Sequence, residues 1–522
     1  MSNVGQVRHV HNLSLTPAVP QATTFFCFAR AKIVHIFSVL VFSLTCQQTS
    51  PLLTVTWVTP HPSIARSSKM DAKSPHIKNR DTPQWGLYQR NMFWRYNDRE
   101  LPPFNTHPDV LERLASRKLS QNGWLYASSN AGLSHTHLAN RQAFFRHKLV
   151  PRQLVDTNER STRTSLFDGK WEVSAPFGIA PVGINKIYHD QGELAVAKAA
   201  GELGLVYSLS TAGSFPIEDV GKANEEGRAN RFKANENLDV EGEGGHENSK
   251  KVPEAPRFFQ LYMPHDNELT LSLLKRAHES GFQACILTTD TSQLGWRHDD
   301  VATSNYAFYR GIGGELGFTD PVFQKRMAEA GVDPQKDAVR AASMWIDTIW
   351  HGRAWSWDKA VWAREKWQEI AGKDKPFLIK GIQSVNDAKK AADLGFEGVV
   401  VSNHAGRQVD GAVGSLDALE SIVKAVGERR GFTVMFDSGV RGAADVMKAL
   451  ALGAKFVFIG RLWIWGLAIM GEEGVRHVLR SLLADFDILM NVMGVRSVDE
   501  IDGSLLESGP RVYGLLNEKS KL

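Results

Sequence analysis

The chain of 522 residues is 43% hydrophobic and 23% charged, which excludes a disordered protein and suffices for one large core or two ordinary ones. Its formal net charge of +4 comes from residues 1–70, which hold five basic and no acidic residues. That leaves 56 of the 61 basic residues against 57 acidic ones, so no nucleic-acid partner is expected. Only three cysteines occur, which excludes a disulfide scaffold or structural zinc site and favours a reducing compartment.

Residues 1–69 form a basic, acid-free leader that is expected to be disordered or not translated. The apolar run 33–46 spans 14 residues, fewer than the roughly 20 that a membrane-spanning helix needs, so no stable membrane insertion is expected. The run is compatible with a late signal-peptide core or with part of a presequence. Translation from Met70 is a third option. A helical segment is expected over 70–175.

Eight short apolar runs follow, each ending in a polar or glycine-rich corner and followed by an amphipathic stretch. This rhythm predicts an α/β protein with a (β/α)8 TIM barrel over 176–510. The expected strands are 177–184, 206–211, 257–263, 284–290, 376–381, 398–404, 433–439 and 456–461.

Two connections between these runs are much longer than the others. Residues 222–255 are polar and lack apolar periodicity, so a solvated insertion is expected there. Residues 291–375, after the fourth strand, contain seven tryptophans. This density favours a packed excursion that covers the mouth of the barrel, although ordinary helix packing explains most of these tryptophans equally well.

The C-terminal tail, 511–522, ends in Ser520-Lys521-Leu522. This tripeptide is a peroxisomal address that a receptor reads on an exposed C-terminus. It predicts a peroxisomal protein, with the cytoplasm or the mitochondrion as alternatives.

The predicted strand ends carry polar side chains that barrel closure would bring into one pocket. The sixth run ends in Ser402-Asn403-His404-Ala405-Gly406-Arg407-Gln408, where an imidazole suited to take a proton stands three residues before a guanidinium suited to hold a carboxylate. A lone histidine after a strand is more often structural than catalytic, so this interpretation depends on the other strand ends. Those ends add Gln260, Tyr262, Thr288, Asp290, Lys380 and Asp437.

The last two strands predict a phosphate site. They end in Asp437-Ser438-Gly439-Val440-Arg441 and Gly460-Arg461, where glycine backbone N–H groups accompany two arginines. Lys380 ends an apolar strand, and its cation there would stabilise negative charge on the N1/C2 edge of a reduced flavin. A Schiff-base lysine is the alternative.

From about Tyr126 to Ile501 the chain resembles the FMN-dependent 2-hydroxy acid oxidase and dehydrogenase family. The seven-residue motif at 402–408 matches the family's SNHGGRQ with one departure, Ala405 in place of glycine, where a methyl group is expected to crowd the flavin or its loop. Within the family the chain is most similar to lactate 2-monooxygenase. That likeness lies in residues 295–297, 304–306, 320–325 and 380–383 and in the long segment before the fifth strand.

The resemblance implies an FMN cofactor and a small 2-hydroxy acid substrate. His404 would be the base, Asp290 would stabilise its imidazolium, and Tyr262 would hydrogen-bond the substrate hydroxyl or the developing carbonyl oxygen. Tyr126, Arg297 and Arg407 would hold the carboxylate, with a packing role as the alternative for Tyr126. The implied FMN-binding residues are Pro181, Val182, Gly183, Ser210, Gln260, Thr288, Lys380, Ser402, Asp437, Gly439, Arg441, Gly460 and Arg461. No metal site is expected.

Ala212 stands where glycolate oxidase, by the same resemblance, carries a bulky tryptophan, so a substrate larger than glycolate, such as lactate, is expected. Oxygen is the expected electron acceptor, giving either peroxide and a free 2-oxo acid or oxidative decarboxylation. A dehydrogenase with another acceptor, an FMN-dependent isomerase and a non-catalytic flavoprotein are the alternatives. The family commonly forms tetramers, so a homo-oligomer is expected.

Overall fold

The structure is a computed structural model that describes residues 83–236 and 252–510. The leader and the C-terminal tripeptide lie outside the described residues, so the expectations for both stay predictions. Among the described residues, no helix combines the length and apolarity that a membrane crossing requires.

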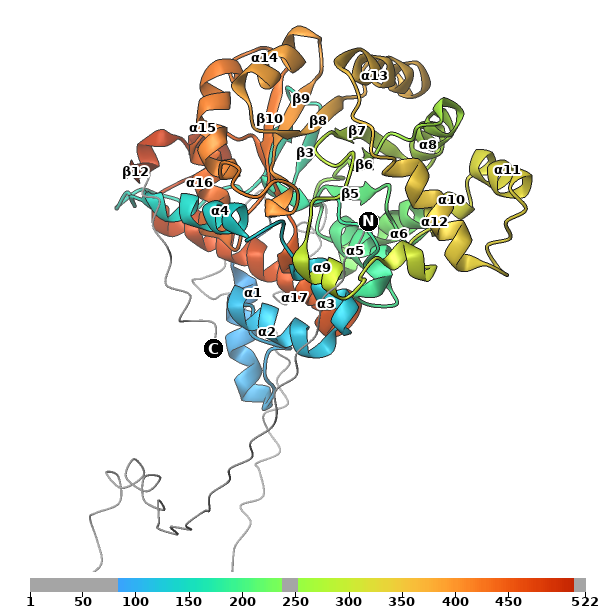
Figure 1. Ribbon diagram of the computed structural model, residues 1–522. Coiled ribbons are helices and arrows are strands. Elements are labelled where there is room, and N and C mark those ends of the chain that lie inside the picture. The colour runs from blue at the N-terminus through green and yellow to red at the C-terminus, as the bar shows by residue number, and fades with distance from the viewer. Residues whose placement is uncertain (1–82, 237–251, 511–522) are drawn as a thin grey trace, which may run out of the picture. The chain divides into compact units, whose positions relative to one another are not determined.

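Eight parallel strands form the centre of the fold, in the order β4-β11-β10-β9-β8-β7-β6-β5 (Figure 1). The two edge strands approach each other, since Ile179 N donates to Val206 O at 2.8 Å. The predicted barrel is therefore confirmed. The strands are β4 (Phe177–Ile179), β5 (Tyr207–Ser210), β6 (Arg257–Leu261), β7 (Phe282–Thr288), β8 (Phe377–Ile382), β9 (Gly398–Val401), β10 (Thr433–Phe436) and β11 (Phe456–Ile459).

Apolar side chains fill the interior of the barrel and close one of its ends. Phe258, Met435 and Phe456 belong to an interior cluster whose side chains are fully buried. A hairpin of β2 (Thr164–Leu166) and β3 (Trp171–Val173) adds Leu166 and Val173 to this cluster near the strand starts. The opposite end, where the strands terminate, remains available for a site.

Helices surround the strands, as the amphipathic stretches predicted (Figure 1). Side-chain caps fix several of their starts; Asp266, for example, accepts hydrogen bonds from the backbone N–H groups of Glu268 and Leu269. The helices that follow the strands are α5 (Gly192–Glu202), α6 (Ile217–Glu236), α8 (Asn267–Glu279), α13 (Trp357–Ala371), α14 (Val385–Asp393), α15 (Ser415–Val426), α16 (Ala443–Ala451) and α17 (Arg461–Met493).

The expectation of a solvated insertion at 222–255 is wrong for its first part, because α6 continues to Glu236. Its glycines explain how a polar sequence packs as a helix. A Cβ atom on Gly227 would collide with the carbonyl oxygen of Lys198 on α5, so the two helix backbones approach closely there. A helix that packs through its glycines does not need apolar side chains three and four residues apart, so the sequence lacks the periodicity that predicts a helix. Residues 237–251 lie outside the described residues.

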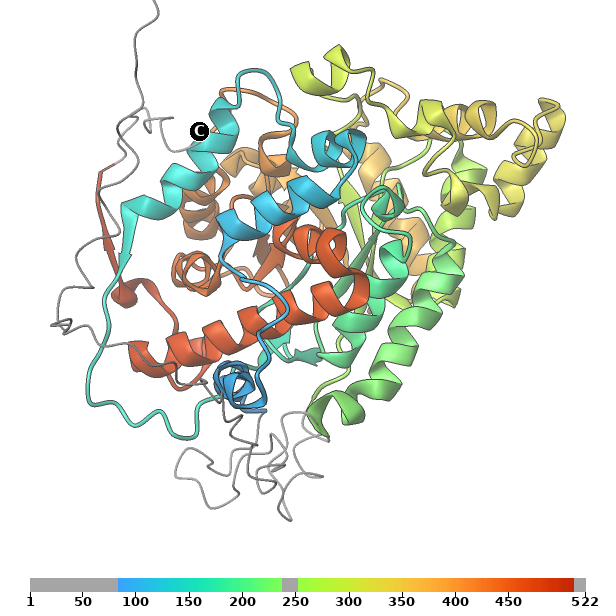
Figure 2. The ribbon, with the colours of Figure 1, turned by 90° about the horizontal axis from the view of Figure 1, so that it is seen from below.

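The N-terminal segment is mainly helical, but it also contributes strands. It contains α1 (Leu87–Trp94), η1 (Arg95–Asp98), α2 (Pro108–Lys118), α3 (Gln121–Ser128) and α4 (His135–Arg146). β1 (His147–Leu149) then pairs antiparallel with β12 (Leu506–Ser508), so the segment is joined to the end of the barrel chain. Figure 2 shows α2 beside α17, where the two helices contact each other.

The excursion after β7 packs, as its tryptophans indicated. It comprises α9 (His298–Ala302), η3 (Ala307–Arg310), α10 (Glu315–Phe318), α11 (Pro321–Glu329) and α12 (Ala338–Ile349). Trp345 and Trp367 are fully buried, whereas Trp296 is 64% exposed. Trp350, at the end of α12, reaches the pocket described below.

Candidate active site

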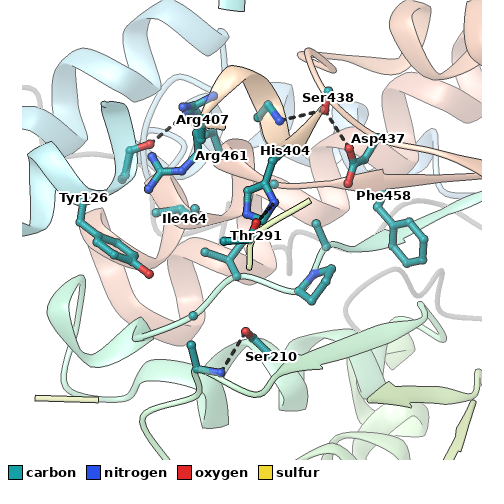
Figure 3. Close-up of a pocket in the computed structure, with 18 of the residues that line it drawn as sticks. Tyr126, Ser210, Thr291, His404, Arg407, Asp437, Ser438, Phe458, Arg461 and Ile464 are labelled. Carbon is teal, nitrogen blue, oxygen red and sulfur yellow. Dashed lines mark hydrogen bonds between the residues drawn. The ribbon is translucent and has the colours of Figure 1, made fainter. Parts of the chain in front are cut away.

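A pocket with an empty volume of about 1000 Å³ opens at the ends of the strands (Figure 3). Fifteen of the predicted site residues line it: Tyr126, Pro181, Val182, Gly183, Ser210, Tyr262, Arg297, Lys380, His404, Arg407, Asp437, Gly439, Arg441, Gly460 and Arg461. The other four, Gln260, Thr288, Asp290 and Ser402, lie behind this lining and are buried or nearly so.

The pocket contains a histidine–carboxylate pair. His404 follows β9 in a short 3-10 turn, and its Nδ1 lies 2.8 Å from Asp290 Oδ1, which follows β7. An ionised carboxylate only accepts hydrogen bonds, so Nδ1 carries the hydrogen and the lone pair of His404 resides on Nε2. The geometry thus leaves Nε2 able to take a proton.

Electrostatics keep this pair in the required charge states. Burial alone would raise the pKa of Asp290, but the charges of His404 and Lys380, with hydrogen bonds from His404 and Thr291, lower it to about 2. Burial lowers the pKa of His404 below its usual value, and Asp290 opposes this only in part. At neutral pH the carboxylate is therefore ionised, and the imidazole is a neutral base.

A ring of hydrogen bonds holds the backbone on both sides of the His404 α-carbon. Ser402 Oγ accepts from His404 N at 3.1 Å and from Lys380 Nζ at 2.8 Å. Lys380 Nζ lies 3.2 Å from Asp437 Oδ2, and Ser438 Oγ donates to Asp437 Oδ1 at 2.8 Å. The ring closes where the N–H of the next residue, Ala405, donates to Ser438 Oγ at 2.9 Å. The ring of hydrogen bonds therefore links the ammonium group of Lys380, on β8, to the backbone of His404.

This turn has a backbone conformation that residues with side chains rarely adopt. The φ angles of His404, Ala405 and Ser438 are +56°, +58° and +87°. Each such residue costs about 1–3 kcal/mol, a strain that clusters at functional sites. Ala405, the one departure from the expected motif, lines the pocket with this left-handed geometry.

A second hydrogen-bond chain lies behind the lining. Ser210 Oγ donates to Gln260 Oε1 at 3.0 Å, and Gln260 Nε2 donates to Thr288 Oγ1 at 2.9 Å. These residues come from β5, β6 and β7. These hydrogen bonds orient the polar groups beneath the pocket. Of the three residues, only Ser210 is part of the lining itself.

Two guanidinium groups converge on one side of the pocket. Arg297 Nε donates to the carbonyl oxygen of Arg407 at 3.1 Å, and Arg407 Nη1 donates to Ser129 O at 2.8 Å. The Arg407 guanidinium also lies 5.5 Å from the ring centre of Tyr126. Burial and the charge of Arg407 lower the pKa of Arg297 to about 10, so an anion between the two would relieve their repulsion.

Two further arginines, Arg441 and Arg461, line the same pocket. Arg461 begins α17, and its guanidinium donates to Ala127 O and to Asn130 Oδ1, at 2.9 and 3.0 Å. Burial and the charges of Arg407 and Arg441 lower the pKa of Arg461 to about 9. These cations and the N-terminus of α17 favour a bound anion.

Ten residues that line the pocket were not predicted from the sequence: Ala127, Ala180, Tyr188, Thr291, Leu294, Trp350, Ser438, Val440, Phe458 and Ile464. Ala212 and Ala405, for which the sequence did give expectations, also line the pocket. Among the unpredicted residues, Ser438 stands in the strand-end run 437–441 and Thr291 directly follows Asp290. Nothing in the sequence distinguishes their hydroxyls from those of ordinary turns. Trp350 lies far along the chain from any strand end, so only the packing of the excursion reveals it.

Comparisons with known proteins agree with this geometry. The family model described as FMN-dependent dehydrogenase matches residues 115–508. The chain belongs to the FMN-dependent alpha-hydroxy acid dehydrogenase family. An FMN-dependent alpha-hydroxy acid dehydrogenase of Penicillium citrinum is 41% identical over 79% of this chain and 94% of its own length. An L-lactate oxidase of Lysinibacillus sphaericus is 34% identical over 74% of this chain and 89% of its own length.

A solved structure of this family, a mandelate oxidase with 3,3-difluoro-2-hydroxy-3-phenylpropionic acid, superimposes with a TM-score of 0.60 and 28% identity, covering 78% of this chain and all of that one. The relatives are alpha-hydroxy acid oxidases and dehydrogenases, which supports the family and does not single out lactate 2-monooxygenase. The chain is therefore an enzyme that oxidises an alpha-hydroxy acid with FMN.

The pocket residues of this family member fit FMN. A Cβ atom on Gly460 would meet no atom within 4 Å, so open space lies against this backbone, beside Arg461. Burial alone would lower the pKa of Lys380, but Asp437 and Asp290 raise it, so its ammonium stays charged at the pocket wall. Arg441 and Arg461 would hold the phosphate, and Lys380 would lie against the flavin. When bound, FMN accepts the two electrons of the oxidation.

Proposed function

We propose that this enzyme oxidises a small, lactate-like L-2-hydroxy acid to the 2-oxo acid, with oxygen as the final electron acceptor. The observation that carries the proposal is the neutral base His404 facing the same pocket as two guanidinium groups. The substrate loses two protons and two electrons. His404 Nε2 takes one proton, and Asp290 stabilises the resulting imidazolium; the second proton and the two electrons would pass to FMN when it is bound.

The two arginines suit a carboxylate better than lysines would. A guanidinium presents a planar fork of donors, so Arg297 and Arg407 together satisfy both oxygens of a carboxylate. The Tyr126 side chain lies against Arg407 and adds a hydroxyl donor to this wall of the pocket. Gripping the carboxylate sets which substrate hydrogen meets the base.

The side-chain end of the substrate has room for a methyl group. Ala212 is 2% exposed and lines the pocket, whose lining also includes the apolar side chains of Leu294 and Trp350. Apolar contacts of this kind suit a small alkyl group. The likeness to an L-lactate oxidase supports the same substrate class.

Replacing Ala212 with Trp is expected to invert the preference between lactate and glycolate. The indole would occupy the space of the lactate methyl group, so kcat/KM for L-lactate should fall about tenfold or more relative to glycolate. Steady-state kinetics with both acids measure the ratio. The matched control, Ala212→Ser, adds little volume and should keep the native preference. An Ala212→Trp enzyme with an unchanged ratio would contradict this assignment of the pocket.

An anaerobic reduction experiment tests the proposed function directly. Mixing the yellow holoenzyme with L-lactate without oxygen should bleach the flavin absorbance, and D-lactate should not. Admitting oxygen should then restore the colour and release pyruvate and hydrogen peroxide in equal amounts. Acetate in place of pyruvate would identify a decarboxylating monooxygenase, and reoxidation only by an added dye would show another acceptor. A flavin that no 2-hydroxy acid bleaches would contradict the proposed function.

A further inference from the structure

Thr291 lies beside His404 in the pocket (Figure 3), and its hydroxyl lies between the side chains of His404 and Asp290. Thr291 Oγ1 donates to Asp290 Oδ1 at 2.7 Å and lies 3.1 Å from His404 Nδ1. Thr291 itself is 3% exposed. One buried hydroxyl thus contacts both the base and the carboxylate partner of that base.

Asp290 receives its hydrogen bonds unevenly. Both His404 Nδ1 and Thr291 Oγ1 bind the same oxygen, Oδ1. Within the described residues, the other oxygen, Oδ2, is buried and has no hydrogen-bond partner. The negative charge of Asp290 is therefore shared between two donors: the imidazole of His404, which titrates, and the hydroxyl of Thr291, which does not. A donor from Thr291 weakens the hold of Oδ1 on the His404 imidazolium.

The other charged groups around His404 do not compensate for this sharing. Lys380, on β8, and Arg297, just before α9, both disfavour a positive charge on the imidazole. Asp290 is the carboxylate that favours it. The Tyr262 hydroxyl is neutral, because burial and then Asp290 raise its pKa. The proton affinity of His404 thus depends on whether Asp290 Oδ1 accepts a hydrogen bond from His404 alone or also from Thr291.

We propose that Thr291 is a positioning residue that tunes the base: by sharing Asp290 Oδ1, its hydroxyl holds the proton affinity of His404 down. The proposal rests on the proposed role of His404 as the base. A base that is half-protonated near the working pH is less available, so a lower proton affinity extends the pH range in which the enzyme works.

Replacing Thr291 with Val removes the hydroxyl and keeps the shape of the side chain. Asp290 Oδ1 then serves His404 alone, which stabilises the imidazolium. The pKa of His404 should rise by about 0.5 to 1 unit, the size expected for one exchanged hydrogen bond. Because the neutral imidazole is the active form, the acid limb of kcat/KM should move to higher pH by the same amount.

Two measurements test this expectation, and one needs no turnover. Histidine-selective 15N labelling of the holoenzyme gives the pKa of His404 by NMR, with His404→Gln identifying its resonance. The pH profile of kcat/KM for L-lactate gives the kinetic value. The matched control is Thr291→Ser, which keeps the hydroxyl and loses the methyl group, and it should retain the native pKa. FMN content and melting temperature should stay native in both variants.

The outcomes separate the two proposals. A Thr291→Val enzyme whose His404 pKa stays within about 0.2 units of the native value would overturn the role of Thr291. An equal shift in Thr291→Ser would also overturn it, because the methyl group would then be responsible. A native enzyme that no 2-hydroxy acid reduces would overturn the proposed function, while the NMR pKa would still decide whether Thr291 tunes His404.

Discussion

Replacing His404 with Gln should give a yellow enzyme whose flavin is no longer bleached by L-lactate at a useful rate. The glutamine side chain can still hydrogen-bond Asp290, but it cannot accept the substrate proton at neutral pH. Removing a general base costs about 10²–10⁴-fold in rate. Stopped-flow absorbance under anaerobic conditions measures the rate constant of flavin reduction at saturating substrate, and the visible spectrum measures the bound FMN.

The matched control is His147→Gln, at a buried histidine that does not line the pocket. His147 lies on β1, where its Nδ1 is 2.7 Å from Ser508 Oγ, and it is fully buried. This variant should lose stability without a comparable loss in the rate of flavin reduction. If His404→Gln keeps more than about a tenth of the native rate, His404 is not the base. If the His404→Gln variant loses FMN, its rate of flavin reduction does not report on proton transfer, and FMN must be restored before the measurement.

The barrel was predictable because its strands are buried on both faces. Runs such as Gly398-Val399-Val400-Val401 are continuously apolar, which is the pattern of a parallel strand covered by helices. The order of the strands then follows from the right-handed connections between successive parallel strands. The same closure predicted which polar strand ends would meet, and His404, Lys380 and Asp437 do line one pocket.

Two features escaped prediction for identifiable physical reasons. The helix α6 was missed because glycines such as Gly227 allow close backbone packing without an apolar stripe. The hydroxyls of Thr291 and Ser438 were missed because a hydroxyl after a strand is equally suited to an ordinary turn. Their importance comes from the partners that folding supplies, Asp290 in one case and Ala405 N in the other.

The arginines of the pocket should separate into cofactor-binding and substrate-binding groups. Arg441 lines the pocket just before the N-terminus of α16, and its backbone N–H donates to Asp445 Oδ2 at 2.9 Å. Burial and the neighbouring charge of Arg141 lower the pKa of Arg441, so the site holds a poorly compensated cation. A phosphate with a charge between about −1.5 and −2 would offset this repulsion.

Arg441→Met should therefore weaken FMN binding by about 10- to 100-fold, the loss expected for a charge-assisted hydrogen bond. Fluorescence titration of FMN into the stripped protein gives Kd. The matched variant is Arg407→Met, which removes an equal charge from the pair with Arg297. It should raise KM for L-lactate and leave the Kd for FMN within a few-fold of native. Weaker FMN binding in Arg407→Met alone would reverse the two assignments. Equal losses in both variants would show that the arginines supply only a diffuse positive potential, because a general field, unlike a directed contact, does not distinguish one guanidinium from another.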